Sequence, residues 1–152
     1  AAGGGGNALM DHEVAYILLR DENPDFIRAL MQPTAMTIPP RMDAAGGVAR
    51  KAETGPVFSI TPDGDLHMRY SMRARNVIWA DDPLTGEARA CLQQLLESDL
   101  PFIYRGRLEP GMGLIGNNIL HDRAAFDDDE VHERHLYRAR YFERLAGTGV
   151  LG

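Results

Sequence analysis

The sequence lacks long apolar runs and clusters of basic residues. Its longest apolar stretch, Val14 to Leu19, is far too short to cross a bilayer, and no charged-then-apolar leader opens the chain. The formal net charge is -6, and binding to a phosphate backbone depends on clustered Lys and Arg. We therefore expect no membrane partner and no nucleic-acid partner.

Cysteine is also nearly absent. Cys91 is the single cysteine among the 152 residues, so these residues cannot form an internal disulfide. This usage fits a reducing compartment, and we interpret the protein as cytoplasmic. Cys91 itself is most simply a residue of a helix core.

What is present is an ordinary globular composition. Apolar residues make up 44% and charged residues 25% of the chain, which predicts one domain with a packed core. The oligomeric state stays open, with a homo-oligomer among the alternatives. A glycine-rich opening, Ala1 to Gly6, leads directly into a helical pattern, as in a chain that begins inside a fold.

Three helices are predicted. The first follows Asp11 as N-cap and carries Val14, Ile17 and Leu18 at helical spacing. The second starts at Asn23-Pro24 and runs to about Met31. The third covers Thr85 to Asp99, and we expect its apolar face to pack against a sheet.

The remaining patterns predict strands. Gly55 to Ile60 and Asp65 to Ser71 form a hairpin around Pro62-Asp63-Gly64, whereas Gln32 to Thr54 is expected to be an irregular lid. Three extended segments follow, Phe102 to Leu108, Leu114 to His121 and Arg134 to Phe142, with a turn at Glu109-Pro110-Gly111 between the first two. This order predicts a mainly β fold with flanking helices, part of an antiparallel double-sheet barrel of the jelly-roll type.

The segment from Pro110 to Tyr141 carries the candidate chemistry. His121 ends a predicted strand, and an arginine on a neighbouring strand, Arg134, can place a carboxylate clamp beside one metal ligand. From Asn118 to Arg123 the chain resembles the segment that holds the distal metal histidine of the taurine dioxygenase family. That family places a 2-oxoglutarate-binding arginine shortly afterwards, and Arg134, separated from His121 by twelve residues, matches it.

The resemblance extends to the glycine-rich opening. The family has a glycine-glycine-x-threonine/serine segment before a helix, and Gly4-Gly5 with Asn7 corresponds to it. Asn7 then replaces the hydroxyl residue that bonds the distal carboxylate of 2-oxoglutarate, and its amide can donate the same hydrogen bond. Arg138, on the same strand face as Arg134, is a further candidate for binding the cosubstrate.

The resemblance implies a double-stranded β-helix (jelly-roll, cupin-like) oxygenase, of which residues 1–152 are the C-terminal portion. It implies Fe(II), with His121 as a metal ligand and catalytic residue, and 2-oxoglutarate and molecular oxygen as cosubstrates. The expected substrate is a small molecule that bears a carboxylate. No histidine is followed two residues later by an acid, so we expect the family's histidine-x-acid ligands upstream of Ala1 and an inactive chain without them.

Other interpretations remain open. His121 alone would more often be a hydrogen-bonded core histidine, and Arg134 an exposed strand residue. Arg138 can instead bind an anionic substrate or line the barrel. Arg123 can belong to the site or pair with the acidic loop Asp127 to Glu130, and Arg140 should reach solvent. The segment Tyr70 to Trp79 can face a substrate anion or be a polar strand face with a packed tryptophan.

A zinc site at His132 and His135 lacks further ligands and is discounted. At the level of function, the alternative is a non-catalytic jelly-roll fragment that binds a ligand, or a half-domain that needs a second polypeptide piece.

Overall fold

The computed structural model describes residues 3–71, 77–127, 135–141 and 143–146. These residues belong to two compact units. The terminal unit contains residues 1–11 and 101–152, and the central unit contains residues 12–100. Each unit has its own sheets.

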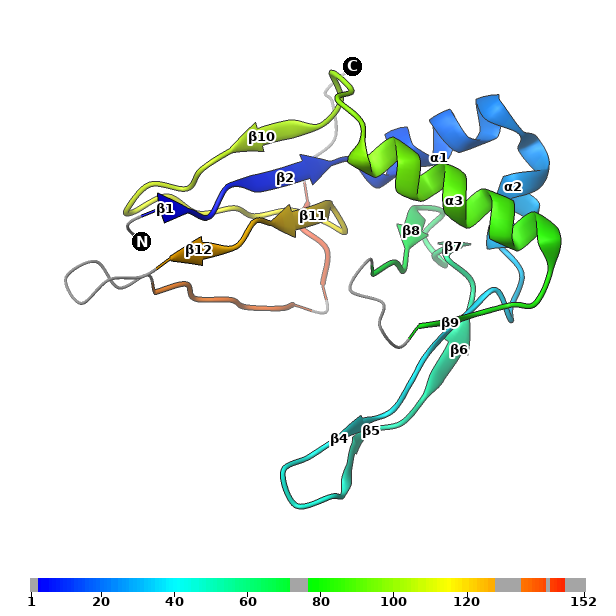
Figure 1. Cartoon of the computed structure of the whole chain (residues 1–152), viewed down its shortest axis with the longest axis horizontal. Coiled ribbons are helices and arrows are strands. Elements are labelled where there is room, and N and C mark those ends of the chain that lie inside the picture. Colours follow the sequence, from blue (N-terminus) through cyan, green and yellow to red (C-terminus); the bar gives the residue numbers. More distant parts are fainter. Residues whose placement is uncertain (1–2, 72–76, 128–134, 142, 147–152) are drawn as a thin grey trace. The chain divides into compact units, whose positions relative to one another are not determined.

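The terminal unit is built on a three-stranded antiparallel sheet (Figure 1). The strand β2 (Asn7–Met10) lies in the middle, between β10 (Tyr104–Gly106) and β11 (Leu120–Arg123). A second, two-stranded pairing joins β1 (Gly3–Gly4) to β12 (Phe126–Asp127). The glycine-rich opening thus forms one edge pairing and then leads into the central strand of the sheet.

The turn between the first two predicted strands is confirmed. Met112 donates its backbone N–H to the carbonyl of Glu109 at 2.9 Å, and Gly111 has a φ of 83°. Such a φ at the third position of the turn is accessible to glycine at little cost. β10 is shorter than the predicted strand. The strand predicted over Leu114 to His121 is wrong for residues 114–119, because β11 begins at Leu120 and continues past His121 to Arg123.

The strand predicted over Arg134 to Phe142 is wrong for residues 135–141, which have no strand assignment. An extended segment becomes a strand only when its backbone groups pair with a neighbour, and these residues form no ladder with β11. Arg134 and residue 142 lie outside the described residues.

The helices of the central unit follow the predicted boundaries closely. They are α1 (His12–Glu22), α2 (Pro24–Leu30) and α3 (Pro83–Glu97). The Asn23 side chain caps α2 by accepting from the N–H of Asp25, and Asp82 caps α3 by accepting from the N–H of Thr85. Among the helices of the described residues, none combines the length and apolar character that a bilayer span requires.

The expectation that the third helix packs against a sheet is wrong. α3 packs against α2 and α1, and the three helices lie together in Figure 1. The fully buried core includes apolar residues from helices and strands alike: Leu19, Leu30, Met36, Val57, Phe58 and Leu92. On α1 the buried positions are His12, Ala15 and Leu19, whereas Ile17 is 43% exposed.

Residues 32–54 are not the irregular lid that the sequence suggested. They contain the strands β3 (Met36–Ile38), β4 (Arg41–Met42), β5 (Val48–Arg50) and β6 (Glu53–Gly55). β3 pairs with β6 and with β9 (Ile78–Trp79), and β4 pairs with β5, so the segment folds back on itself as a long arm (Figure 1). Residues 41–54 of this arm are exposed, which explains why they show no apolar alternation.

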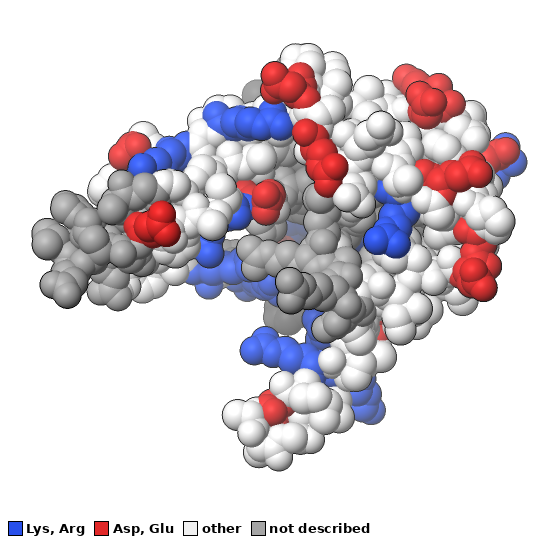
Figure 2. Space-filling model, viewed as in Figure 1, with Lys and Arg blue, Asp and Glu red and all other residues white. Residues whose placement is uncertain are grey.

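The predicted hairpin is confirmed as β7 (Phe58–Ile60) and β8 (Leu66–Met68), with Gly64 in its turn at a φ of 90°. The molecule therefore consists of small antiparallel sheets with a few helices. The part of the chain that the structure describes forms no closed barrel, so the jelly-roll core stays a prediction. On the face seen in Figure 2, acidic and basic side chains are interspersed over the molecule.

Gly4 offers a test of how the opening is held. It has a φ of 69°, and a Cβ there would collide with the carbonyl oxygen of Ala125. We expect Gly4→Ala to destabilise the terminal unit by about 1–2 kcal/mol, because the left-handed backbone disfavours L side chains. Amide hydrogen exchange at Gly5, whose N–H bonds Ala125 at 2.9 Å, should report the loss.

The matched control is Gly6→Ala, since a Cβ at Gly6 meets nothing within 4 Å. Equal exchange rates at Gly5 in the two variants would contradict a close approach at Gly4.

Candidate functional site

The strand register brings the candidate residues to one face of the terminal sheet. His121 lies opposite Leu9, and Leu9 lies opposite Tyr104, so these three side chains form a row across the three strands. Residues directly opposite in antiparallel strands, and residues two apart along a strand, point to the same face. Asn7 is two residues from Leu9, and it therefore shares the face of His121.

A second row lies beside the first. Asn7 is opposite Arg123 on β11 and opposite Gly106 on β10. The Arg123 guanidinium lies over the ring of Phe126, with its central carbon 4.9 Å from the ring centroid. Arg123 is thus held on this face by a cation–π contact.

His121 has two hydrogen-bond partners that determine its tautomer. Nδ1 is 3.1 Å from the carbonyl oxygen of Ile119, which can only accept, so Nδ1 carries the proton. Nε2 is 2.8 Å from a terminal guanidinium nitrogen of Arg138, which can only donate, so Nε2 is the acceptor. The neutral imidazole satisfies both contacts, and its Nε2 lone pair accepts from Arg138.

This arrangement is one that a metal-binding histidine requires. A backbone carbonyl that accepts from one ring nitrogen fixes the ring and leaves the other nitrogen as the ligand. His121 is exposed, so a ligand can reach Nε2 without moving the core. His121 therefore fits one ligand of a metal site, and the described residues contain no group of three or more His, Cys, Asp and Glu side chains that could complete it.

The segment that carries Arg138 is tied to the strand that carries His121. The Asn117 amide donates to the carbonyl of Leu145 at 3.0 Å and accepts from the N–H of Leu145 at 2.9 Å. Asn118 follows with a φ of 50°, a left-handed conformation that asparagine tolerates better than most residues. These contacts hold residues near 145 beside the entry to β11.

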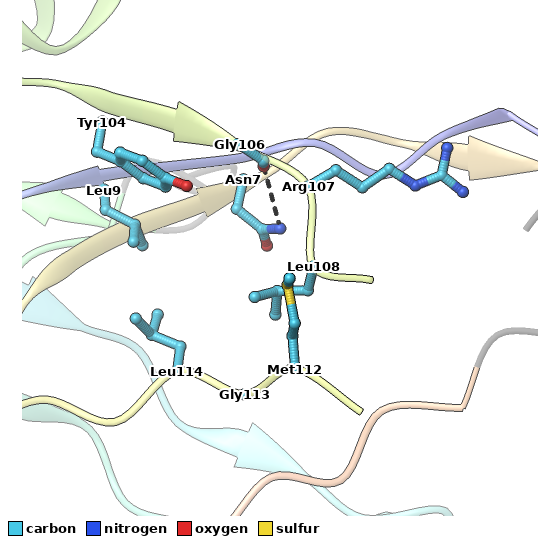
Figure 3. A pocket seen from close by; sticks show the side chains of 9 residues that line it. All are labelled: Asn7, Leu9, Tyr104, Gly106, Arg107, Leu108, Met112, Gly113 and Leu114. Atoms are coloured by element: carbon cyan, nitrogen blue, oxygen red, sulfur yellow. Dashed lines mark hydrogen bonds between the residues drawn. The ribbon is translucent and has the colours of Figure 1, made fainter. Parts of the chain in front are cut away.

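A cavity of about 300 Å³ opens on the same face of the sheet. Its polar lining includes Asn7 and Tyr104, and its apolar walls are Leu9, Leu108, Met112 and Leu114 (Figure 3). The Asn7 amide donates to the carbonyl of Gly106 at 3.5 Å, a long contact, and the Arg107 side chain points away from the cavity (Figure 3). The turn at Glu109-Pro110-Gly111 brings Leu108 and Met112 to the cavity.

The structure brings together three of the four predicted site residues. Asn7 and His121 share a sheet face, and Arg138 hydrogen-bonds His121. Arg134 and His132 lie outside the described residues. Arg140 is exposed, as expected for a solvent-facing arginine.

Tyr104 and Gly106 were not predicted as site residues. Their place on the face depends on pairing with β2, almost a hundred residues earlier in the chain, which no local pattern reveals. The sequence did predict a strand here. In a strand, Tyr104 and Gly106 are two residues apart and lie on the same face, and this was the available signal.

The aromatic segment of the central unit is a packed cluster in its described part. The rings of Tyr70 and Trp79 are 6.2 Å apart, and Arg89 lies over the Trp79 ring at 5.4 Å. Burial raises the pKa of Tyr70, Arg89 opposes this rise, and Glu97 adds to it. These contacts favour the interpretation as a packed tryptophan, while Arg73 and Arg75 lie outside the described residues.

Cys91 is half-buried on α3 rather than fully in the core. Burial raises the pKa of its thiol, and the nearby charge of Glu22 raises it further. A raised thiol pKa lowers the thiolate fraction at neutral pH, so Cys91 is poorly suited to nucleophilic chemistry.

Two comparisons with known proteins show what this chain is similar to. The sequence profile of the taurine catabolism dioxygenase TauD, TfdA family matches residues 1–140. A uridine-5'-phosphate dioxygenase from Amycolatopsis sp is 33% identical over 145 residues, which are 92% of this chain and 51% of that protein. The chain therefore spans about half the length of this relative.

Proposed function

The chain belongs to the taurine catabolism dioxygenase TauD, TfdA family, and we propose that it is the C-terminal portion of an Fe(II)- and 2-oxoglutarate-dependent dioxygenase. In this proposal residues 1–152 are part of one oxygenase domain, and the remaining metal ligands belong to a histidine-x-acid motif upstream. The whole protein oxidises a small anionic molecule with molecular oxygen.

The observation that carries the proposal is the hydrogen bonding of His121. Its Nδ1–H bonds the Ile119 carbonyl at 3.1 Å, which leaves Nε2 as the acceptor nitrogen, and His121 shares its sheet face with Asn7. Bound iron would supply the activation of oxygen, coupled to decarboxylation of 2-oxoglutarate to succinate.

Other residues are proposed to bind and orient the cosubstrate 2-oxoglutarate. Asn7 can donate its amide N–H to the distal carboxylate of 2-oxoglutarate if it gives up its long contact with Gly106. Arg134 is proposed as the charged partner of the same carboxylate, because a planar guanidinium can pair both oxygens at once. The apolar walls of the cavity, Leu9, Leu108, Met112 and Leu114, can contact the carbon chain of the cosubstrate.

The substrate is proposed to be anionic on two grounds. Arg123 and Arg138 lie at or beside the face of His121, so a carboxylate or phosphate can be paired there. The relative's name specifies uridine 5'-phosphate, a nucleotide anion. Uridine 5'-phosphate and small carboxylates are the first substrates to compare.

The test uses the full-length protein with its upstream segment. Anaerobic addition of Fe(II) and then 2-oxoglutarate should produce a weak visible charge-transfer band. Aerobic turnover with the correct anion should then release succinate in proportion to product. A full-length protein that forms no band under these conditions would contradict the proposal and favour a non-catalytic binding role.

Arg138 gives a second test, because its guanidinium bonds the nitrogen that a metal would take. The contact and a metal ion on Nε2 exclude each other, so metal binding must release Arg138. We expect Arg138→Gln to bind Co(II) about 2- to 10-fold more tightly than the wild type, the worth of one hydrogen bond. Calorimetric titration without cosubstrate measures this.

The matched control for this test is Arg140→Gln, an exposed arginine two positions later. If Arg138→Gln binds Co(II) no more tightly than Arg140→Gln, the competition between Arg138 and the metal is ruled out.

A further inference from the structure

Tyr104 is the polar side chain of the cavity to which no role has been assigned. It lies opposite Leu9 on β10, in the same row as His121. Its phenol leans along the strand over Gly106, because a Cβ placed on Gly106 would be 2.6 Å from the Tyr104 hydroxyl oxygen. Only a glycine at position 106 leaves room for the ring in this position.

The Tyr104 hydroxyl and the Asn7 amide meet at one end of the cavity. Gly106 lies directly opposite Asn7 in the β2–β10 pairing, and the phenol covers Gly106, so both groups flank the same backbone position. Figure 3 shows the hydroxyl directed toward Asn7 and the cavity rather than away from them. Besides Arg107, whose side chain points away, and two glycines, the rest of the lining consists of apolar side chains.

We propose that Tyr104 is a positioning residue for the cosubstrate, whose hydroxyl donates a hydrogen bond to the distal carboxylate of 2-oxoglutarate beside the Asn7 amide. This inference rests on the proposed function. A carboxylate has about four acceptor sites on two oxygens, so it can accept from an amide and a phenol together. Hydrogen bonds to a charged acceptor are about twice as strong as neutral ones.

The row of residues also sets the size of ligand that fits. His121 and Tyr104 are separated by the central strand, and two strand spacings amount to about 10 Å. A dicarboxylate that reaches from the His121 end of the row to the Tyr104 end must have a chain of several carbons. The site should therefore discriminate 2-oxoglutarate from its four-carbon analogue oxaloacetate.

The test measures cosubstrate binding by calorimetry, anaerobically, in full-length protein loaded with Fe(II). Tyr104→Phe removes the hydroxyl and keeps the ring. It should weaken binding of 2-oxoglutarate about 10-fold or more, the worth of a hydrogen bond to a charged group. Binding of 2-oxovalerate, which lacks the distal carboxylate, should not change. Gly106→Ala, which displaces the phenol, should reproduce the selective loss.

The matched control is Tyr137→Phe, a tyrosine of the same unit that is 99% exposed. It should leave both affinities unchanged. Two results would overturn the role of Tyr104 while the proposed function stands. In the first, Tyr104→Phe binds 2-oxoglutarate as tightly as the wild type does. In the second, its affinity for 2-oxovalerate falls as much as its affinity for 2-oxoglutarate. If the wild type does not bind 2-oxoglutarate at all, the proposed function itself fails.

Discussion

Replacing His121 with alanine in the full-length protein should abolish the charge-transfer band formed with Fe(II) and 2-oxoglutarate, and succinate release with it. Losing an outer-shell partner of a metal ligand costs roughly 10- to 100-fold, so the loss of a ligand itself should exceed that range. His121 is exposed, so its removal leaves no cavity in the core. The unfolding transition should shift little, which separates a chemical role from a structural one.

A histidine of the other compact unit provides the control. His67 lies on β8 opposite Ser59, in the central unit, and β8 is not a strand of the sheet that carries His121. His67→Ala should retain the charge-transfer band and the release of succinate, even if its unfolding temperature is lower than that of the wild type. A His121→Ala protein that keeps its iron affinity and its band would remove His121 from the metal site and, with it, the main support for the oxygenase function.

The sequence predicted the residues of the candidate site better than their surroundings. Asn7 and His121 were identified from short motifs, and the register of β2 with β11 brings them to one face. Tyr104 was missed because its place depends on a pairing between distant segments. A motif records residue types along the chain, whereas a site also depends on which strands lie side by side.

The fold was predicted where the signal is local. Asn23 before Pro24 marked a helix start, and Pro62-Asp63-Gly64 marked a hairpin turn, since each motif acts on its own backbone. The exposed arm was missed because neither face of it is buried, so no alternation appears in its sequence. For α3 the apolar face was recognised, but the elements it packs against were not. An apolar helix face looks the same in the sequence whether it packs against helices or against a sheet.

Arg69 follows β8 directly, and its guanidinium links that hairpin to the β3–β6 pairing of the central unit. It donates to the carbonyl oxygens of Met36 at 2.6 Å, Gly55 at 2.8 Å, Glu53 at 3.1 Å and Pro56 at 3.3 Å. These carbonyls belong to β3, to β6 and to the segment that enters β7. A single planar guanidinium thus donates to four carbonyl acceptors.

Arg69→Met should therefore destabilise the central unit by about 3 kcal/mol or more. Methionine keeps much of the side-chain volume, but it removes the guanidinium donor from several partly buried carbonyls. A buried acceptor that loses its donor costs about 1–3 kcal/mol. The measurement is equilibrium urea unfolding, followed through Trp79 fluorescence, since Trp79 lies on β9 in the sheet that Arg69 contacts.

Arg69→Lys should recover only part of the loss, because an ammonium group lacks the planar fork. Arg28→Met is the matched control: Arg28 is an exposed helix residue whose ion pair with Asp25 is worth little. Equal unfolding midpoints for Arg69→Met and Arg28→Met would mean that water replaces the guanidinium at these carbonyls. The arm and the hairpin would then be held together by the apolar core around Met36, Val57 and Phe58 alone.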